Sequence, residues 1–364
     1  GLAGGGLCRA VAAEGRGRAV TTMVSRKRRA AASAFVGLGF AAACTALRRR
    51  FSDGVTILAY HRVVDVPDED AWPFDIELVS ASAAGFREQM AHLRRHFVPL
   101  TIGQVFGRLA KGEPLPRGAA VVTFDDGFDD NYHVAFPVLR ELGIPATIFV
   151  STGYLDSGET FWFDQLAHQI LTASADSVEV ELLGRVALGT GTPARRAALR
   201  GVLRRLKQLP ESGRIAVLDS FTRALASGRP LRDPRSRPLT WDQAREMSRG
   251  GIEFGSHSVS HPILSRVDEA QLEHEVAASR RRIEEETGQP VTSIAYPVGG
   301  PGAFTPGVLE RVRASGYVAG VSYRAGVQSP RQWDPFALRR IPVERYIGAS
   351  LFRASLALPR VFGS

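Results

Sequence analysis

The alternation of short apolar runs with helical patterns restricts the fold of this chain more than any other feature of its sequence. Between the apolar runs, hydrophobic residues recur every three to four positions, and a long helix is expected over 269–286. Strands that alternate with helices form a parallel sheet, open or closed into a barrel, so an α/β fold is predicted. The expected strands lie at residues 55–60, 119–124, 146–150, 252–254, 293–296 and 317–323.

One long stretch interrupts this alternation. Residues 156–238 contain an apolar helix, a short strand-like run and two arginine-rich helices, and they end in a Pro/Arg-rich linker at 229–238. We interpret them as a mainly helical insertion packed on the main fold, because they lack a strong core of their own. The predicted division is a basic segment at 1–50, a main domain at 51–345 that contains the insertion, and a C-terminal tail at 346–364.

The positive charge of the chain is confined to its N-terminal segment. Residues 1–50 hold ten of the 46 basic residues and one of the 37 acidic residues. The rest of the chain, with 36 of each, is neutral. A neutral body has no long-range attraction to a phosphate backbone, so nucleic acid is not an expected partner.

The same segment has the pattern of a targeting or anchoring sequence. Residues 26–29 are Arg-Lys-Arg-Arg, an uncharged run rich in Ala and Gly follows at 30–47, and three arginines come directly after it. A basic region before an apolar run of small residues is typical of a secretory signal or a signal anchor. This pattern predicts a cell-envelope protein, exported or associated with the membrane through its N-terminus. The alternative is a cytoplasmic protein with a basic tail.

Two adjacent carboxylates follow the apolar run at 119–124. They are Asp125 and Asp126, within the sequence Thr-Phe-Asp-Asp-Gly. Active sites of α/β folds lie at the carboxyl ends of their parallel strands, which is the position of this pair. Asp-Asp-Gly alone is also a common turn sequence.

Two histidines follow a second strand in the same way. His257 and His261 come directly after the run at 252–254. Cysteine occurs only at positions 8 and 44, so a cysteine-based zinc site is excluded for the rest of the chain. Two imidazoles and one carboxylate would form a metal site with open positions for water and substrate. The neighbouring carboxylate would point elsewhere and be free to act as a base.

These motifs together resemble those of the polysaccharide deacetylases of carbohydrate esterase family 4, the NodB-homology domain. Thr-Phe-Asp-Asp-Gly at 123–127 and His-Ser-Val-Ser-His-Pro at 257–262 match the first two motifs of that family, and Ala-Tyr-Pro-Val-Gly at 295–299 is similar to the third. The resemblance implies a distorted, incomplete (β/α) barrel. It also implies metal-dependent hydrolysis of N-acetyl groups on N-acetylhexosamine residues of a polysaccharide, with release of acetate.

The resemblance also implies roles for individual residues. By motif position, Asp126, His257 and His261 would hold a divalent metal, with Zn²⁺ expected and Co²⁺ or Ni²⁺ as alternatives. Asp125 would be the general base. The oxyanion would lie between the metal and a backbone N–H, for which we expect that of Tyr296.

Two departures from the family pattern concern the general acid and an arginine that orients the base. The chain has no histidine after His274, where the family has its acid. A subgroup similar to bacterial exopolysaccharide deacetylases begins with a Tyr-His motif, so we expect His61 to be the acid. Ala295 stands where the family has the arginine, and Arg339 or Arg340 is a candidate to replace it.

Two other functions can be set against this expectation. The departures above are compatible with a catalytically weakened carbohydrate-binding protein on the same fold. A glycosidase is disfavoured, because its two carboxyl groups should flank the bond roughly 5–9.5 Å apart, which adjacent residues cannot easily do.

Overall fold

The computed structural model describes residues 26–225, 231–300, 302–329, 331 and 333–363. Its centre is a closed ring of parallel strands in the order β1-β12-β11-β10-β9-β6-β5, in which β1 pairs with both β12 and β5. A further strand, β4 (Val98–Leu100), pairs with the first half of β5. The ring strands are β1 (Thr56–Tyr60), β5 (Ala119–Phe124), β6 (Ala146–Val150), β9 (Ile252–Ser256), β10 (Ser293–Ala295), β11 (Ala319–Ala325) and β12 (Leu338–Pro342).

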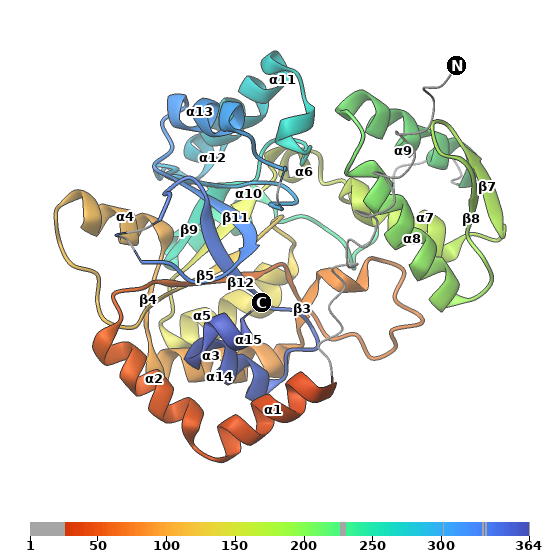
Figure 1. Ribbon diagram of the computed structural model, residues 1–364. Coiled ribbons are helices and arrows are strands. Elements are labelled where there is room, and N and C mark those ends of the chain that lie inside the picture. The colour runs from red at the N-terminus through yellow and green to blue at the C-terminus, as the bar shows by residue number, and fades with distance from the viewer. Residues whose placement is uncertain (1–25, 226–230, 301, 330, 332, 364) are drawn as a thin grey trace, which may run out of the picture.

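This architecture confirms the predicted α/β barrel, and the six predicted strands are present (Figure 1). The last barrel strand, β12, was not expected, because its sequence Leu-Arg-Arg-Ile-Pro is not an apolar run. The helices around the barrel are α3 (Ala83–His96), α4 (Ile102–Ala110), α5 (Phe136–Leu142), α6 (Thr152–Ser157), α10 (Trp241–Arg249), α11 (Glu269–Glu273), α12 (Ser279–Thr287) and α13 (Pro306–Ala314).

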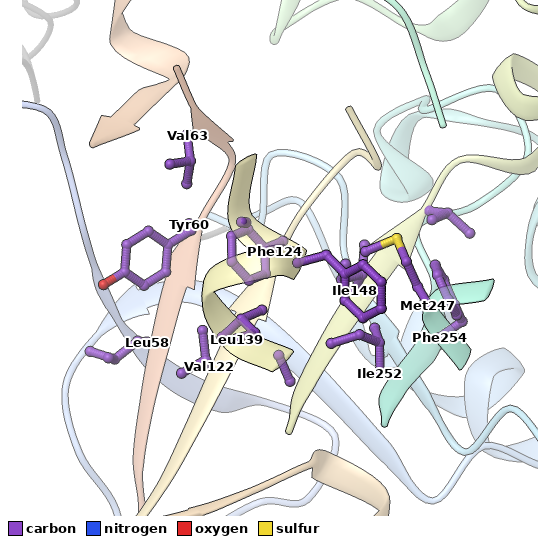
Figure 2. Close-up of a cluster of buried hydrophobic side chains, with 14 of the residues drawn as sticks. Leu58, Tyr60, Val63, Val122, Phe124, Leu139, Ile148, Met247, Ile252 and Phe254 are labelled. Atoms are coloured by element: carbon purple, nitrogen blue, oxygen red, sulfur yellow. The ribbon is translucent and has the colours of Figure 1, made fainter. Parts of the chain in front are cut away.

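Successive residues of β1 and β5 belong to two different hydrophobic clusters. Leu58 and Tyr60 of β1 pack outward against the helices, together with Phe124 of β5 and Leu139 of α5, as Figure 2 shows. Ile57 belongs instead to the cluster inside the barrel. Side chains alternate between the two faces of a strand. The residues that follow Ile57 at two-residue steps therefore point into the barrel and reach its mouth at the carboxyl end.

The helix expected over 269–286 is divided by a π-helical segment. α11 ends at Glu273, His274–Ala278 is π-helical, and α12 follows. The wider turn directs Glu275 into the protein, where it is only 2% exposed. π-Helical segments within α-helices are frequent at functional sites, and this one contacts the loop that carries both histidines.

The insertion has a hydrophobic core of its own, contrary to the sequence expectation. It consists of α7 (Trp162–Thr172), a hairpin of β7 (Ser177–Val180) and β8 (Gly184–Ala187), α8 (Thr192–Leu206) and α9 (Glu211–Leu225). Leu166, Val202 and Phe221 are among its buried side chains. The arginines of α8 dilute the apolar pattern along the sequence, but three helices and the hairpin bring their apolar faces together. Part of the expected linker, 226–230, lies outside the described residues.

A buried ion-pair network attaches the insertion to the barrel. Arg62 of β2 (Arg62–Val63) donates from Nε to Asp130 at 2.9 Å, and its Nη1 lies 3.6 Å from a carboxylate oxygen of Asp164 on α7. Ser236 donates its hydroxyl to Asp164 at 2.5 Å. Burial raises the pKa of Asp164 to about 7, although the Arg62 guanidinium opposes this effect.

We expect Asp164→Asn to reduce the pH dependence of stability. A carboxyl whose pKa is higher in the folded than in the unfolded state binds its proton more tightly when folded. The free energy of unfolding therefore falls as the pH rises from about 4 to about 7, by about 1.4 kcal/mol per pH unit for one such group. Urea denaturation at pH 5 and pH 7.5 measures this slope. The exposed substitution Asp176→Asn is the control, and an unchanged slope in Asp164→Asn would contradict the assignment.

The two ends of the described chain pack together beside α3. The N-terminal helices α1 (Arg26–Gly37) and α2 (Phe40–Phe51) contact α14 (Ala349–Ala357), and α15 (Pro359–Phe362) follows it. Residues expected as a tail thus form helices, with Leu351 and Ala354 buried against Ala32. Residues 1–25 of the predicted basic segment lie outside the described residues. No single described helix is long and apolar enough to cross a membrane; α1 and α2 pass that test only together, bent by 77°.

Candidate active site

Strand alternation brings the predicted site residues to one end of the barrel. Asp125 is two residues beyond Thr123 on the inward-facing side of β5, and His61 has the same relation to Ala59 on β1. Arg340 follows the inward-facing Leu338 of β12 in the same way. The carboxyl ends of parallel strands share one rim, so residues far apart in sequence meet there.

Asp126, His257 and His261 form one buried group, as predicted. The Asp126 Oδ1 atom lies 3.4 Å from Nε2 of His257 and 3.2 Å from Nε2 of His261. All three ligand atoms lie within 4.8 Å of one another. Donors bound to a tetrahedral metal at 2.0–2.1 Å are separated by about 3.4 Å, which matches the two distances from Asp126.

The orientation of the His257 ring also fits a metal. Nδ1 of His257 lies 2.8 Å from the carbonyl oxygen of Ala295, so Nδ1 carries the proton and Nε2 keeps its lone pair. The indole N–H of Trp162 donates to the carbonyl of His261 at 3.2 Å. Burial alone would raise the pKa of Asp126, but the two neighbouring histidines hold this pKa well below its usual value.

Backbone strain is concentrated in this site. Of the five non-glycine residues with positive φ in the described part of the chain, four belong to the three motifs, and the fifth is Leu182. Such conformations cost of order 1–3 kcal/mol each and persist only where the surroundings enforce them. The four are Asp126 (φ 72°), Ser258 (φ 68°), His261 (φ 57°) and Val298 (φ 65°).

Glu275 enforces the strained histidine loop. Its carboxylate accepts the N–H groups of Val259 and Ser260 at 2.8 and 2.9 Å, and the hydroxyl of Ser260 at 2.6 Å. The sequence pattern does not reveal Glu275, because this residue lies in a charged helical stretch. Only the π-helical turn directs its side chain inward.

Asp125 forms a buried bidentate ion pair with Arg340. The two guanidinium nitrogens lie 2.7 and 2.6 Å from the two carboxylate oxygens, and Arg340 is fully buried. The same guanidinium donates to the Ser322 carbonyl and to the hydroxyl of Thr123. Burial alone would raise the pKa of Asp125, but Arg340 holds it below its usual value. Of the two arginines proposed from the sequence, Arg340 therefore contacts Asp125, whereas Arg339 is exposed.

His61 lies beside this pair. Its Nε2 is 3.9 Å from the Asp125 carboxylate, and its side chain is 16% exposed. The backbone of His61 is fixed on both sides, because its N–H donates to Ser80 and its carbonyl accepts the amide of Asn131. The ring also lies against Tyr323, with ring centres 5.4 Å apart.

Tyr296 does not offer the N–H group expected for the oxyanion. That N–H donates to the carbonyl of Val321 at 3.2 Å within the barrel, so it is already used. The phenol of Tyr296 donates to the carbonyl of Phe336 at 2.8 Å. Val298, two residues further on, lines the same cavity. Its N–H makes no hydrogen bond with any described residue.

A cavity of about 260 Å³ opens over these residues. One wall comes from the insertion, through Trp162, Phe163 and Leu203, and another from Glu77 and Leu78, which precede β3 (Val79–Ala81). Trp162 thus lines the cavity. Trp241 and Trp333 are not at this cavity: the first donates to Asp156 and the second stacks on Phe106.

Comparisons with known proteins agree with this geometry. A family model described as polysaccharide deacetylase matches residues 112–320, more than half of the chain. A poly-β-1,6-N-acetyl-D-glucosamine N-deacetylase of Escherichia coli K12 is 36% identical over 95 residues, which are 26% of this chain. The matched part is only 13% of that relative.

Solved structures share the fold at low sequence identity. The Streptococcus pyogenes deacetylase PplD, solved with acetate, has a TM-score of 0.56 and 20% identity, covering 85% of this chain and 99% of its own. A polysaccharide deacetylase from Bacillus cereus has a TM-score of 0.51 and 19% identity, covering 83% and 69%. The match of the family model over most of the barrel, with the three motifs gathered at one cavity, shows that the chain belongs to the polysaccharide deacetylase family.

Proposed function

We propose that this chain hydrolyses the N-acetyl group of N-acetylhexosamine residues in a polysaccharide, with a divalent metal, releasing acetate and leaving a free amine. The observation that carries the proposal is the Asp125–Arg340 pair directly beside the Asp126, His257 and His261 group in one cavity. A carboxylate held next to a metal site is the arrangement that metal-assisted hydrolysis needs. The named substrate of the Escherichia coli relative makes a poly-N-acetylglucosamine the first polymer to test.

Asp126, His257 and His261 would hold the metal. Zn²⁺ is the expected ion, and the same donors suit Co²⁺ or Ni²⁺. When bound, the metal lowers the pKa of a coordinated water and polarises the acetyl carbonyl. The carbonyl of Ala295 orients His257, and the indole of Trp162 holds the backbone of His261.

Asp125 would take the proton from the attacking water. Arg340 keeps this carboxylate ionised at neutral pH and fixes its plane. General-base catalysis of this kind typically contributes 10²–10⁴-fold. We propose that the N–H of Val298, in place of that of Tyr296, donates to the oxyanion, because it is unbonded among the described residues and belongs to the cavity wall.

His61 would give a proton to the leaving amine as the carbon–nitrogen bond breaks. We expect His61→Ala to lower kcat by about 10²–10⁴-fold while metal content stays unchanged. An ester substrate with a good leaving group should lose much less activity, because its leaving group needs no proton. His133→Ala is the matched control, since that side chain is 60% exposed. Equal losses on both substrates would assign His61 a structural role.

Acetate release from a panel of acetylated glycans, with and without a chelator, tests the whole proposal. Release that stops with the chelator and returns with Zn²⁺ supports it. The second candidate is a carbohydrate-binding protein on the same fold, which predicts bound metal and bound glycan but no acetate from any polymer. The ordered Asp125–Arg340 pair favours the enzyme, because a binding protein has no use for a positioned base.

We also propose that residues 51–345, with the insertion at 156–238, act as one catalytic unit in the cell envelope. The insertion supplies a wall of the cavity, so it belongs to the working site. The basic segment at 1–50 motivates the location. Detection of the protein in the membrane or exported fraction, rather than in the cytosol, is the corresponding test.

A further inference from the structure

The helices α1 and α2 are part of the folded protein. Ala32 of α1 is fully buried and Thr45 of α2 is 6% exposed. Arg28 donates to the carbonyl of Phe362 at 2.6 Å. Arg48 donates to the carbonyl of Leu356 at 2.5 Å and to the hydroxyl of Thr56 at 2.6 Å. These bonds join the helix pair both to the C-terminal helices and to the first barrel strand.

The outer side of this pair carries an apolar ridge, made of Leu38, Phe40, Leu47 and Phe51. Their exposed fractions are 71%, 56%, 57% and 75%. Positions 40, 47 and 51 fall on one face of α2, turned about 100° from the buried face. The ridge supplies four of the nine large hydrophobic side chains that are exposed in the described part of the chain. Such a concentration marks an interaction surface.

The helix pair that carries the ridge is basic. Residues 26–51 contain seven Lys or Arg and no Asp or Glu, although the chain beyond residue 50 is neutral. Arg28 and Arg48 bind the protein body, and the stem of Arg49 packs along Gly118 on the side of α2 opposite the ridge. Arg26, Arg29 and Arg50 are exposed. Exposed aromatic and leucine side chains bordered by basic residues are the pattern of helices that lie in a lipid interface.

The ridge and the catalytic cavity lie at different ends of the barrel. α2 leads into β1 at its amino end, where Arg48 contacts Thr56. The cavity lies at the carboxyl ends of the strands, with the insertion as one wall. Figure 1 shows α1 and α2 along the lower edge, away from the insertion helices. A surface bound at the ridge would leave the cavity open.

We propose that α1 and α2 form a fixed docking surface for an anionic lipid bilayer. The ridge enters the headgroup region, and Arg26, Arg29 and Arg50 pair with lipid phosphates. The chain lies on the bilayer, and its cavity faces away from the lipid. This inference concerns the surface of the fold, so failure of the proposed chemistry would leave it untouched.

Sedimentation of the full chain with vesicles tests the docking surface. Vesicles of phosphatidylcholine mixed with phosphatidylglycerol should bind the wild type, and phosphatidylcholine alone should bind it weakly. The triple variant Phe40→Ser, Leu47→Ser, Phe51→Ser should lower the partition coefficient at least about tenfold, since each large side chain contributes through its buried apolar area. The matched control replaces three exposed hydrophobic residues elsewhere: Leu182→Ser, Ile215→Ser, Val318→Ser.

A second pair of variants separates charge from apolar contact. Arg29→Gln with Arg50→Gln should weaken binding to anionic vesicles several-fold and reduce its salt dependence, because juxtamembrane basic residues attract anionic lipid. Arg204→Gln with Arg281→Gln, exposed on other helices, is the control. Thermal unfolding of each variant verifies folding independently of activity. In the single variant Phe40→Trp, the emission of the introduced tryptophan should shift to the blue when anionic vesicles are added.

Three results would overturn the inference. The first is unchanged vesicle binding by the triple serine variant. The second is a dimer without lipid that these three substitutions dissociate, which would make the ridge an interface between two copies. The third is protein that leaves native membranes only with detergent and not with alkaline carbonate, which would indicate a spanning segment. Absence of acetate release, by contrast, would count against the proposed function alone.

Discussion

Replacing Asp126 with asparagine or His257 with alanine is expected to remove both bound metal and acetate release. The three donors lie within 4.8 Å of one another. His257→Ala removes one of them, and Asp126→Asn replaces the charged carboxylate with a neutral amide oxygen that binds a cation much more weakly. The loss should exceed the about 10²–10⁴-fold that a general base alone supplies, because both water activation and carbonyl polarisation disappear. Asparagine is preferred at position 126, since it tolerates the left-handed backbone there better than alanine.

Elemental analysis and acetate assays on the same preparations measure the two losses together. Asp129→Asn, in the same loop, and His274→Ala, an exposed histidine, are the matched controls and should keep both metal and activity. Full acetate release by a metal-free wild type would contradict the metal-dependent reaction. Metal retained in both variants would place the metal at other donors.

Arg340→Met is expected to impair catalysis and stability together. It leaves the Asp125 carboxylate buried without its partner, and breaking a buried pair in this way costs about 3–5 kcal/mol. Without Arg340, burial would raise the pKa of Asp125, so the base would be protonated over a wider range. The acid limb of the activity profile should therefore move to higher pH, with partial recovery of activity in alkaline solution.

The pH dependence of the free energy of unfolding provides a second measurement. In the wild type the folded-state pKa of Asp125 is below its unfolded value, so the pair contributes stability above the unfolded pKa. That contribution is lost as the pH falls through the folded pKa. Arg340→Met should lack this contribution. The free energies of unfolding measured with urea at pH 3.5 and pH 7 should therefore differ less in this variant than in the wild type.

Three further variants separate the positioning of Asp125 from a general effect of Arg340 on stability. Arg340→Lys should rescue only part of the activity, because an ammonium cannot make the bidentate contact. Arg340→Met combined with Asp125→Asn should regain stability but not activity, since the unpaired charge is gone together with the base. Arg339→Met, at the exposed neighbouring position, should change neither. Normal activity and an unchanged pH profile in Arg340→Met would exclude the positioning role.

Much of the barrel could be predicted because its strands are buried on both sides and leave continuous apolar runs in the sequence. β5 and β6 were predicted with their observed bounds. β12 could not be predicted in this way, because Arg339 and Arg340 interrupt its apolar pattern. The core of the insertion could not be predicted either, because its buried positions are spread over helices that carry many arginines.

The linear sequence determined the chemistry of the site: two carboxylates after one strand and two histidines after another, in motifs whose spacing is local. Only the tertiary structure decided which partners these groups have. It selected Arg340 over Arg339, brought Glu275 to the histidine loop, and engaged the N–H of Tyr296 with Val321. The physical reason is that backbone direction, strand alternation and a single π-helical turn decide where a side chain points, and these depend on contacts between residues far apart in the chain.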